Sequence, residues 1–123
     1  MRLITILMLA GLTGLIACST GKDVVVHKSG ESWREGRLTA GRDTYELACA
    51  DCHDTGKLGA PLTGNPKDWS NRSDLWDAVL AEHAKTGYLE MPEKGGHPEV
   101  TEESVEAATE YMLHVTFPDK PQG

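Results

Sequence analysis

The chain has 123 residues, which is room for a single domain. Its formal net charge of −7 at pH 7 argues against nucleic acid as a partner, because phosphate backbones are bound by surfaces rich in Lys and Arg. Apparently non-globular segments at the N-terminus leave a folded part of roughly 80 residues, a size that commonly needs disulfides, a metal or another covalent aid for stability.

Residues 1–17 have the layout of a secretory signal peptide. Arg2 precedes an almost wholly apolar or small stretch, Leu3 to Ala17, which is short for a membrane span of about 20 residues. An uncleaved signal anchor is the alternative. Cleavage after Ala17 removes Arg2 and leaves 11 basic and 19 acidic residues, so the formal charge moves from −7 to −8. The mature chain is therefore acidic, which favours protein partners with a basic docking face.

The end of this stretch, Leu15-Ile16-Ala17-Cys18, resembles the lipobox of bacterial lipoproteins, in which the signal is cut before a cysteine that carries lipid. The resemblance implies that Cys18 is acylated, and several acyl chains anchor a protein stably where one alone is marginal. We therefore expect a protein of the bacterial cell envelope, lipid-anchored and facing the periplasm. An ordinary signal, in which Cys18 has no special role, is the alternative. Ser19 weakly favours sorting to the outer membrane.

Residues 18–38 are interpreted as the lipid anchor followed by a flexible tether. The segment from Ser19 to Leu38 is polar and is interrupted only by Val24–Val26 and Trp33. About 20 flexible residues have a typical end-to-end distance of roughly 25 Å, enough to hold a small domain clear of the lipid headgroups. A short strand over Val24–Val26 is the alternative.

Residues 39–117 are predicted to form an all-α domain, followed by a tail at 118–123. The first helix begins at Thr39 as N-cap and runs to the cysteines at 49 and 52, because four residues at helical spacing share one face. These residues are Gly41, Tyr45, Ala48 and Cys52. Five Gly and Pro residues between Asp54 and Asn71 then predict a long loop.

Two further helices are predicted, and neither alternates in the way that a strand would. The second begins near Ser73 as a cap, stops at Gly87 and has an apolar stripe of Leu75, Trp76, Val79 and Leu80. A Gly- and Pro-rich loop over 88–100 leads to the last helix, which begins at Thr101 and ends at Pro118. Its stripe consists of Val105, Ala108, Met112 and Val115.

The motif that carries the chemistry is Cys49-Ala50-Asp51-Cys52-His53, the C-x-x-C-H signal for covalent attachment of c-type haem. Cysteines three positions apart at a helix end reach the vinyl groups on one edge of the porphyrin, and His53 turns its ring under the iron. A thioredoxin-like motif would need a strand and helix arrangement that is absent from the pattern. A structural zinc site would need two further ligands, and the mature domain has no third cysteine.

Five residues are candidates for the sixth position of the iron: Met91, Met112, His83, His97 and His114. Met91 is favoured because it lies in a flexible loop about 40 residues after His53, and Met/His ligation suits electron carriers. Met112 shares an apolar stripe and is expected in the core, whereas His97 is a competitor in the same loop as Met91. His83 and His114 lie on predicted helices and are expected at the surface or at a cap.

From about Gly41 to Leu113, the sequence resembles the class I cytochromes c, and within them the bacterial cytochrome c5 group. Gly41 and Tyr45 stand before Cys49 as the glycine and aromatic of that family's N-terminal helix do, and Tyr111 resembles the aromatic on the C-terminal helix that crosses it. The resemblance implies three to four helices wrapped around one covalently bound haem c, with the N- and C-terminal helices crossing.

The resemblance also implies roles for four residues. Pro61 corresponds to the proline whose carbonyl accepts a hydrogen bond from the proximal His53. Trp69 and Arg72 stand where the group often places residues near the haem propionates, although a core aromatic and a surface charge are the alternatives. Met91 begins a segment like the c5-type axial methionine loop, preceded here by Glu90 where a small or apolar residue is more usual.

The sequence therefore predicts a carrier of single electrons between redox proteins, with no acid, base or nucleophile and no enzyme activity. One alternative is a haem-based gas sensor or peroxidase with a labile sixth ligand. Another is a cytochrome subunit of a larger oxidoreductase. Glu90 beside Met91 is the feature that keeps the sensor alternative open, because it weakens the axial loop.

Overall fold

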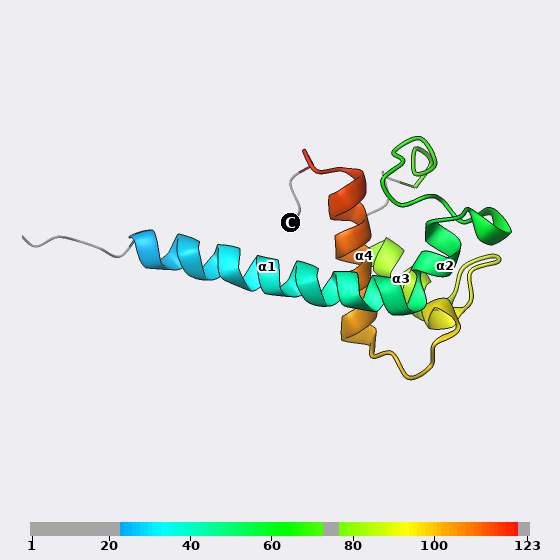
Figure 1. The fold of residues 1–123 in the computed structure, drawn as a ribbon, viewed down its shortest axis with the longest axis horizontal. Coiled ribbons are helices and arrows are strands. Elements are labelled where there is room, and N and C mark those ends of the chain that lie inside the picture. The colour runs from blue at the N-terminus through cyan, green and yellow to red at the C-terminus, as the bar shows by residue number, and fades with distance from the viewer. Residues whose placement is uncertain (1–22, 73–76, 121–123) are drawn as a thin grey trace, which may run out of the picture.

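The computed structural model describes residues 23–72 and 77–120. Within these ranges the chain forms four α-helices and two short 3-10 helices, with an isolated bridge but no strand (Figure 1). The elements are α1 (Asp23–Ala48), α2 (Ala50–His53), η1 (Lys57–Gly59), α3 (Asp77–Thr86), η2 (Glu93–Gly96) and α4 (Glu102–Thr116). The predicted all-α architecture is confirmed.

The fold is organised by the crossing of α1 and α4, which is visible in Figure 1. Gly41 of α1 lies directly against the backbone of Ala107 on α4, and a β-carbon at Gly41 would overlap the Ala107 carbonyl group. The absence of a side chain lets the two helix backbones approach this closely. One turn further on, the Tyr45 and Tyr111 rings pack with their centroids 5.5 Å apart. The predicted crossing of N- and C-terminal helices is thus present.

The core is small and lies under this crossing. Tyr45, Trp69, Ala108 and Met112 form one buried cluster, so Met112 is a core residue as expected. Among the described residues of the predicted apolar stripes, two are exposed: the exposed fraction is 40% for Val79 and 42% for Val115. The hydrophobic periodicity therefore located the helices but overestimated the width of their buried faces.

The flexible tether predicted up to residue 38 is wrong over residues 23–38, because α1 begins at Asp23 and not at Thr39. Gly30 and Gly36 lie inside this helix, where a glycine costs only about 1 kcal/mol relative to alanine. Neither glycine has an atom within 4 Å of a built β-carbon, so this part of α1 is open around both. Figure 1 shows the N-terminal part of α1 extending beyond the other helices.

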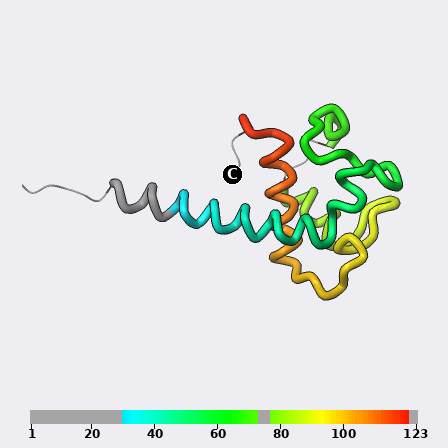
Figure 2. The backbone as a smooth tube through the Cα atoms, in the orientation of Figure 1, coloured from blue at the N-terminus to red at the C-terminus, as the bar shows by residue number. Residues whose placement is uncertain are grey.

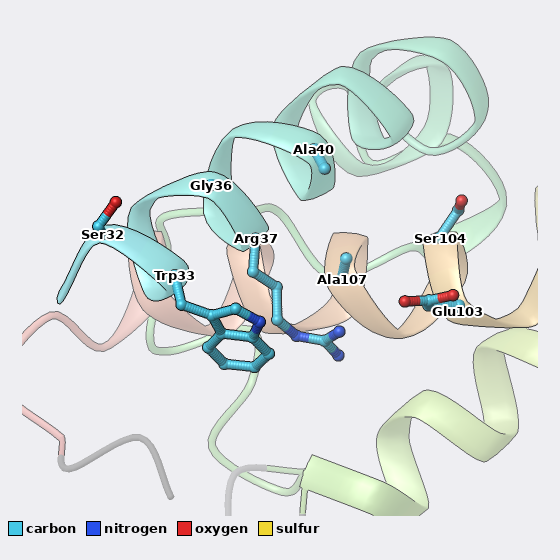
Figure 3. Close-up of a pocket in the computed structure, with 8 residues that line it drawn as sticks. All are labelled: Ser32, Trp33, Gly36, Arg37, Ala40, Glu103, Ser104 and Ala107. Atoms are coloured by element: carbon cyan, nitrogen blue, oxygen red, sulfur yellow. The ribbon is translucent and has the colours of Figure 1, made fainter. Parts of the chain in front are cut away.

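Contacts with α4 begin before residue 39. Arg37 pairs with Glu110, with 2.5 Å between Nε and Oε2, and its guanidinium lies 5.8 Å from the Trp33 ring centroid. A groove of about 380 Å³ separates the two helices at this point (Figure 3). Its lining includes Trp33 and Arg37 from α1 and Glu103 and Ala107 from α4. These contacts help to extend the helix through the segment that was predicted to be flexible.

The last helix begins where the sequence predicted. Thr101 is the N-cap of α4, and its hydroxyl accepts a hydrogen bond from the Ser104 backbone N–H at 3.2 Å. Phe117 closes the helix, one residue before Pro118. For the second helix, α3 is described from Asp77, so the predicted cap at Ser73 lies outside the described residues, as do the signal peptide and Cys18.

Two irregular segments, 54–72 and 87–101, gather at the end of the molecule toward which α1 runs. Figure 2 shows both on the same side of the α1–α4 crossing, with α2 between the end of α1 and the first of them. The first segment contains η1 and the second contains η2. The fold therefore brings together the cysteine motif and both loops that were expected to do chemistry.

Candidate functional site

The cysteine motif stands at the point where α1 ends. Cys49 donates its backbone N–H to Tyr45 at 2.9 Å and so completes the last turn of α1, and the chain then turns into α2. Cys49 and Cys52 are both half-buried and unpaired, and they lie one helical turn apart. Burial, together with the nearby Cys52, raises the pKa of the Cys49 thiol to about 11. Before any covalent attachment, Cys49 is therefore a neutral thiol at pH 7.

His53 is buried and has one fixed partner. Its Nδ1 lies 2.8 Å from the Pro61 carbonyl oxygen, and because a carbonyl can only accept, Nδ1 carries the proton. The other ring nitrogen, Nε2, then holds a free lone pair, which is the state that binds a metal. Burial lowers the pKa of His53, against the opposing effect of the Pro61 bond, and this keeps the ring neutral at pH 7.

The loop that presents Pro61 is held by hydrogen bonds of the two residues that follow Pro61. On the C-terminal side, Thr63 donates its backbone N–H to the His53 carbonyl at 2.9 Å. Between Pro61 and Thr63, the Leu62 carbonyl accepts a hydrogen bond from the Trp69 indole at 2.8 Å, and the Leu62 N–H donates to the Asp68 carboxylate at 3.1 Å. The Pro61 carbonyl is thus fixed opposite His53 by neighbours that are themselves hydrogen-bonded.

Trp69 and Arg72 both lie near His53. The Trp69 ring packs with the imidazole at 6.1 Å between centroids and 22° between planes, and Trp69 belongs to the core. Its indole N–H is used by Leu62, so this side chain supports the proximal loop as a core aromatic. Arg72 donates to the Asp68 carbonyl at 2.9 Å, and its charge contributes to lowering the pKa of His53. A role of either residue near propionates stays a prediction.

Met91 stands at the end of a tight turn. Tyr88 and Met91 exchange both backbone hydrogen bonds, each 2.9 Å long, across the intervening Leu89 and Glu90. The turn follows Gly87, whose φ of +87° ends α3 in a left-handed conformation. A β-carbon on Gly87 would lie 3.1 Å from the Met91 carbonyl oxygen. Met91 itself is half-buried.

The Met91 loop is packed on the cysteine motif through Gly95. Gly95 of η2 lies so close to Ala48 that a β-carbon would overlap the Ala48 carbonyl oxygen. Ala48 directly precedes Cys49, so the loop that carries Met91 is fixed to the residue before the motif. The φ of +65° at Gly95 is a second reason for glycine at this position. Neither constraint was recognised from the sequence, although the pair Gly95-Gly96 marked the loop.

The other candidates for the sixth position have different surroundings. Met112 is buried in the core, and His97 Nδ1 lies 2.9 Å from Glu99 on the surface. His83 stacks on Tyr88 at 4.1 Å between ring centroids, whereas His114 is half-buried on α4. Met91 and His97 are therefore the two candidates on the loop that is packed against the motif, and the His97 ring is already paired with Glu99.

A hydrogen bond between Tyr45 and Asp54 was missed by sequence reasoning. The Tyr45 hydroxyl donates to the Asp54 carboxylate, nine residues further along and directly after His53. Burial, followed by this bond, raises the pKa of Tyr45 well above its ordinary value, so the hydroxyl stays protonated and remains a donor. An acidic residue immediately after the motif, with a buried tyrosine one turn before it, was the available signal.

The donor set suits a c-type haem and does not suit a zinc ion. Two thiols and one imidazole lie within residues 49–53, and the described residues contain no group of three or more His, Cys, Asp or Glu side chains arranged to hold a metal ion. A haem supplies the metal itself and needs from the chain two thiols and an axial nitrogen. No helix in the described ranges is long and apolar enough to cross a membrane.

Residues 36–112 match the family model described as cytochrome c oxidase, cbb3-type, subunit III. Among similar proteins, cytochrome c-555 of Prosthecochloris aestuarii is 35% identical over 85 residues, which cover 63% of this chain and 86% of that protein. Cytochrome c-551 of Halorhodospira halochloris is 38% identical over 77 residues, covering 59% and 94%. Cytochrome c5 of Ectopseudomonas mendocina is 34% identical over 80 residues, covering 63% and 91%.

A solved structure also resembles this fold. It is the cytochrome in a crystal structure of an electron transfer complex of nitrite reductase with cytochrome c, with a TM-score of 0.59 and 30% identity over 63% of this chain and 94% of that one. The match to the family model covers more than half of the chain, and the motif of Cys49, Cys52 and His53 falls inside it. The chain therefore belongs to the cytochrome c family, as a class I monohaem cytochrome c that binds haem c covalently.

Proposed function

We propose that this cytochrome is a membrane-anchored, periplasm-facing carrier of single electrons between redox proteins, with His53 and Met91 as the two axial ligands. The observation that carries the proposal is the 2.8 Å bond from His53 Nδ1 to the Pro61 carbonyl oxygen beside two free thiols. When bound, haem c supplies an iron that alternates between the ferric and ferrous states. The chain contributes the covalent attachment, the ligands and a stable geometry, and no side chain acts as acid, base or nucleophile.

The role of His53 follows from its hydrogen bond. The Pro61 carbonyl fixes the ring orientation. It also makes Nε2 a better electron-pair donor to a metal, because it accepts a hydrogen bond from the Nδ1 proton. Trp69 packs against the ring and limits its rotation. Because the ring is buried and held from two directions, His53 would keep its position when the charge of a bound haem changes.

The role of Met91 follows from how its loop is packed. Gly95 fixes one part of the loop to Ala48, next to Cys49, while the backbone pair of Tyr88 and Met91 fixes the other part. A thioether ligand opposite an imidazole raises the reduction potential into the range suited to electron carriers. The pairing of the His97 ring with Glu99 at the surface supports Met91 over His97, the other candidate in this loop.

The acidic net charge of the chain supports partners that have a basic docking surface. With a formal charge of −7, the chain attracts a cationic docking face from a distance, which raises the association rate at low salt. A solved relative is seen in complex with nitrite reductase, which supports a redox enzyme as the class of partner. Turnover with such a partner is expected to slow as ionic strength rises, and a rate that does not change with salt would remove the steering role.

Attachment to the membrane is proposed through lipid on Cys18. The test is Cys18→Ser in the full chain, produced in a bacterial host that exports and attaches c-type haem. The parent chain is expected to incorporate labelled fatty acid and to begin at Cys18, whereas Cys18→Ser is expected to incorporate none. A parent chain that begins at Met1 and carries no acyl chain would exclude the lipid anchor and favour an uncleaved signal.

The ligand set is tested on the same exported protein by its optical spectrum. A pyridine haemochrome spectrum typical of two thioether bonds is expected for the parent chain. Met91→Ala is expected to lose the sulfur-to-iron charge-transfer absorption of the ferric form, and His97→Ala, in the same loop, is expected to keep it. An unchanged low-spin spectrum in Met91→Ala would exclude Met91 as the ligand.

A second candidate function is a subunit of a larger oxidoreductase. The family model matched by residues 36–112 is described as a subunit of a cytochrome c oxidase, which favours this candidate. Extraction in mild detergent distinguishes the two: a free carrier elutes from size-exclusion chromatography near the mass of one 13.4 kDa chain plus detergent, whereas a subunit elutes in a larger complex with haem-stained partners.

A further inference from the structure

His83 and Tyr88 form a close aromatic pair between α3 and the Met91 turn. Their ring centroids are 4.1 Å apart and their planes differ by 10°, so the two rings are stacked almost parallel. His83 lies within α3 and is half-buried, whereas Tyr88 lies after the helix and is 47% exposed. Neither residue had a role in the attachment of haem or in the proximal loop.

Tyr88 is joined directly to Met91. Its backbone N–H donates to the Met91 carbonyl and its carbonyl accepts from the Met91 N–H, both at 2.9 Å. Any displacement of Tyr88 therefore displaces Met91 with it. The stack on His83 fixes Tyr88 to α3, and α3 packs on α4.

The turn between Tyr88 and Met91 is not favoured by its own sequence. Leu89 has a φ of +53°, a left-handed conformation that is unfavourable for a residue with a side chain. Leu89 is also 83% exposed, so burial of its side chain returns little of that cost. Contacts outside the turn must therefore hold it, and the stacked pair of His83 and Tyr88 is one such contact.

We propose that His83 and Tyr88 are positioning residues, whose stacked rings hold the Tyr88–Met91 turn in place and so keep the Met91 thioether available to the sixth position. The inference rests on the proposed function, in which Met91 is the axial ligand. An aromatic pair contributes interaction free energy beyond burial of its surface. This contribution adds to the free energy that an external ligand must overcome to displace Met91.

The test uses the exported holoprotein and competition by carbon monoxide for the reduced form. Tyr88→Leu and His83→Ala each remove the stack at a half-exposed position, so both are expected to fold. Each is expected to raise the apparent affinity for carbon monoxide about fivefold, the factor that corresponds to about 1 kcal/mol. The sulfur-to-iron absorption of the ferric form is expected to weaken in parallel. Tyr88→Phe and His83→Phe keep two stacked rings and are expected to resemble the parent protein.

Trp33→Leu is the matched control, because it removes an exposed aromatic contact with Arg37 on α1, away from the turn. It is expected to lower the free energy of unfolding without changing carbon monoxide affinity. The proposal is overturned when Tyr88→Leu and His83→Ala alter only the free energy of unfolding, as this control does. Met91→Ala separates the two ideas: if it keeps the sulfur absorption, Met91 ligation itself is wrong, and if it loses the absorption while the stack variants do not, only the positioning role is wrong.

Discussion

Gly95 lies against the carbonyl group of Ala48 at a distance that leaves no room for a β-carbon. Ala48 is the last residue of α1 and Cys49 follows it, so the contact joins the loop of Met91 to the helix end that presents the first thiol. The position of the Met91 loop is therefore coupled to that of the cysteine motif through one backbone contact. This contact, together with the Tyr88–Met91 turn, supports the proposal that Met91 is a ligand.

Gly95→Ala is expected to displace the Met91 loop from the cysteine motif. The variant adds overlap with the Ala48 carbonyl to the cost of a positive φ, and overpacking of this kind costs about 1–3 kcal/mol. The measurements are the sulfur-to-iron absorption and denaturant unfolding of the holoprotein. Gly96→Ala is the control in the same loop, because Gly96 also has a positive φ but only an ordinary 3.9 Å contact with Pro92. Equal effects of the two substitutions would mean that the Ala48 contact is unimportant.

Two glycines of α1 are expected to respond to alanine in opposite directions. Gly41→Ala places a methyl group into the Ala107 backbone and is expected to destabilise the protein by about 1–3 kcal/mol. Gly36→Ala meets nothing within 4 Å and is expected to stabilise the helix by up to about 1 kcal/mol. Urea unfolding followed by circular dichroism measures both. Destabilisation by Gly36→Ala would contradict a helix at this position in solution.

Removal of the N-cap of α4 is expected to weaken the helix that crosses α1. Thr101→Ala deletes the hydroxyl that accepts from the Ser104 N–H, and loss of such a cap costs about 1 kcal/mol. Thr101→Ser keeps the accepting oxygen and is expected to remain within a few tenths of a kcal/mol of the parent. Thermal unfolding of the three proteins is the measurement. A Thr101→Ser protein as unstable as Thr101→Ala would point to the methyl group instead of the hydrogen bond.

The ion pair of Lys85 and Glu106 is expected to contribute to acid sensitivity. Glu106 accepts from Lys85 with 2.5 Å between Oε1 and Nζ, and this bond lowers the pKa of the carboxyl below its ordinary 4.5. A carboxyl with a lowered folded-state pKa stabilises the protein above its unfolded pKa, and the stabilisation is lost as the pH falls through the folded pKa. The Glu106 side chain is 41% exposed, so solvent screens the pair and the effect is small.

The measurement is the free energy of unfolding between neutral and acid pH for the parent chain and Glu106→Gln. Below pH 4.5 the parent is expected to lose stability more steeply than Glu106→Gln, and the two curves are expected to converge at the acid end. Glu103→Gln removes a like charge from the same helix and serves as the control. Parallel curves for the parent and Glu106→Gln would exclude a contribution from this pair.

The motif and the helix crossing could be predicted because both depend on short-range pattern. Cys49, Cys52 and His53 lie within five consecutive residues, and the spacing of Gly41 and Tyr45 places both residues on one helix face. The bond from His53 to Pro61 was implied by family resemblance, and the structure contains it. The boundary of α1 was wrong because a polar segment with few apolar residues resembles a flexible tether when its contacts with α4 are unknown.

The contacts of Gly95 with Ala48 and of His83 with Tyr88 could not be predicted in the same way. Each pairs a loop residue with a helix residue, and the conformation of the loop is decided by its backbone dihedral angles more than by any periodicity. Leu89, Lys94 and Leu58 have positive φ values although they carry side chains. Nothing in the sequence distinguishes these three residues from others of their kind.

The uninterrupted course of α1 affects how the cytochrome meets its partners. An α-helix of 26 residues is about 39 Å long, and its last residue is next to the first thiol. Only four residues separate Cys18 from Asp23. With lipid on Cys18, the tilt of α1 relative to the membrane would therefore set both the height of the redox centre above the bilayer and the direction that it faces. A partner embedded in the same membrane would bind the cytochrome only at particular tilts of α1.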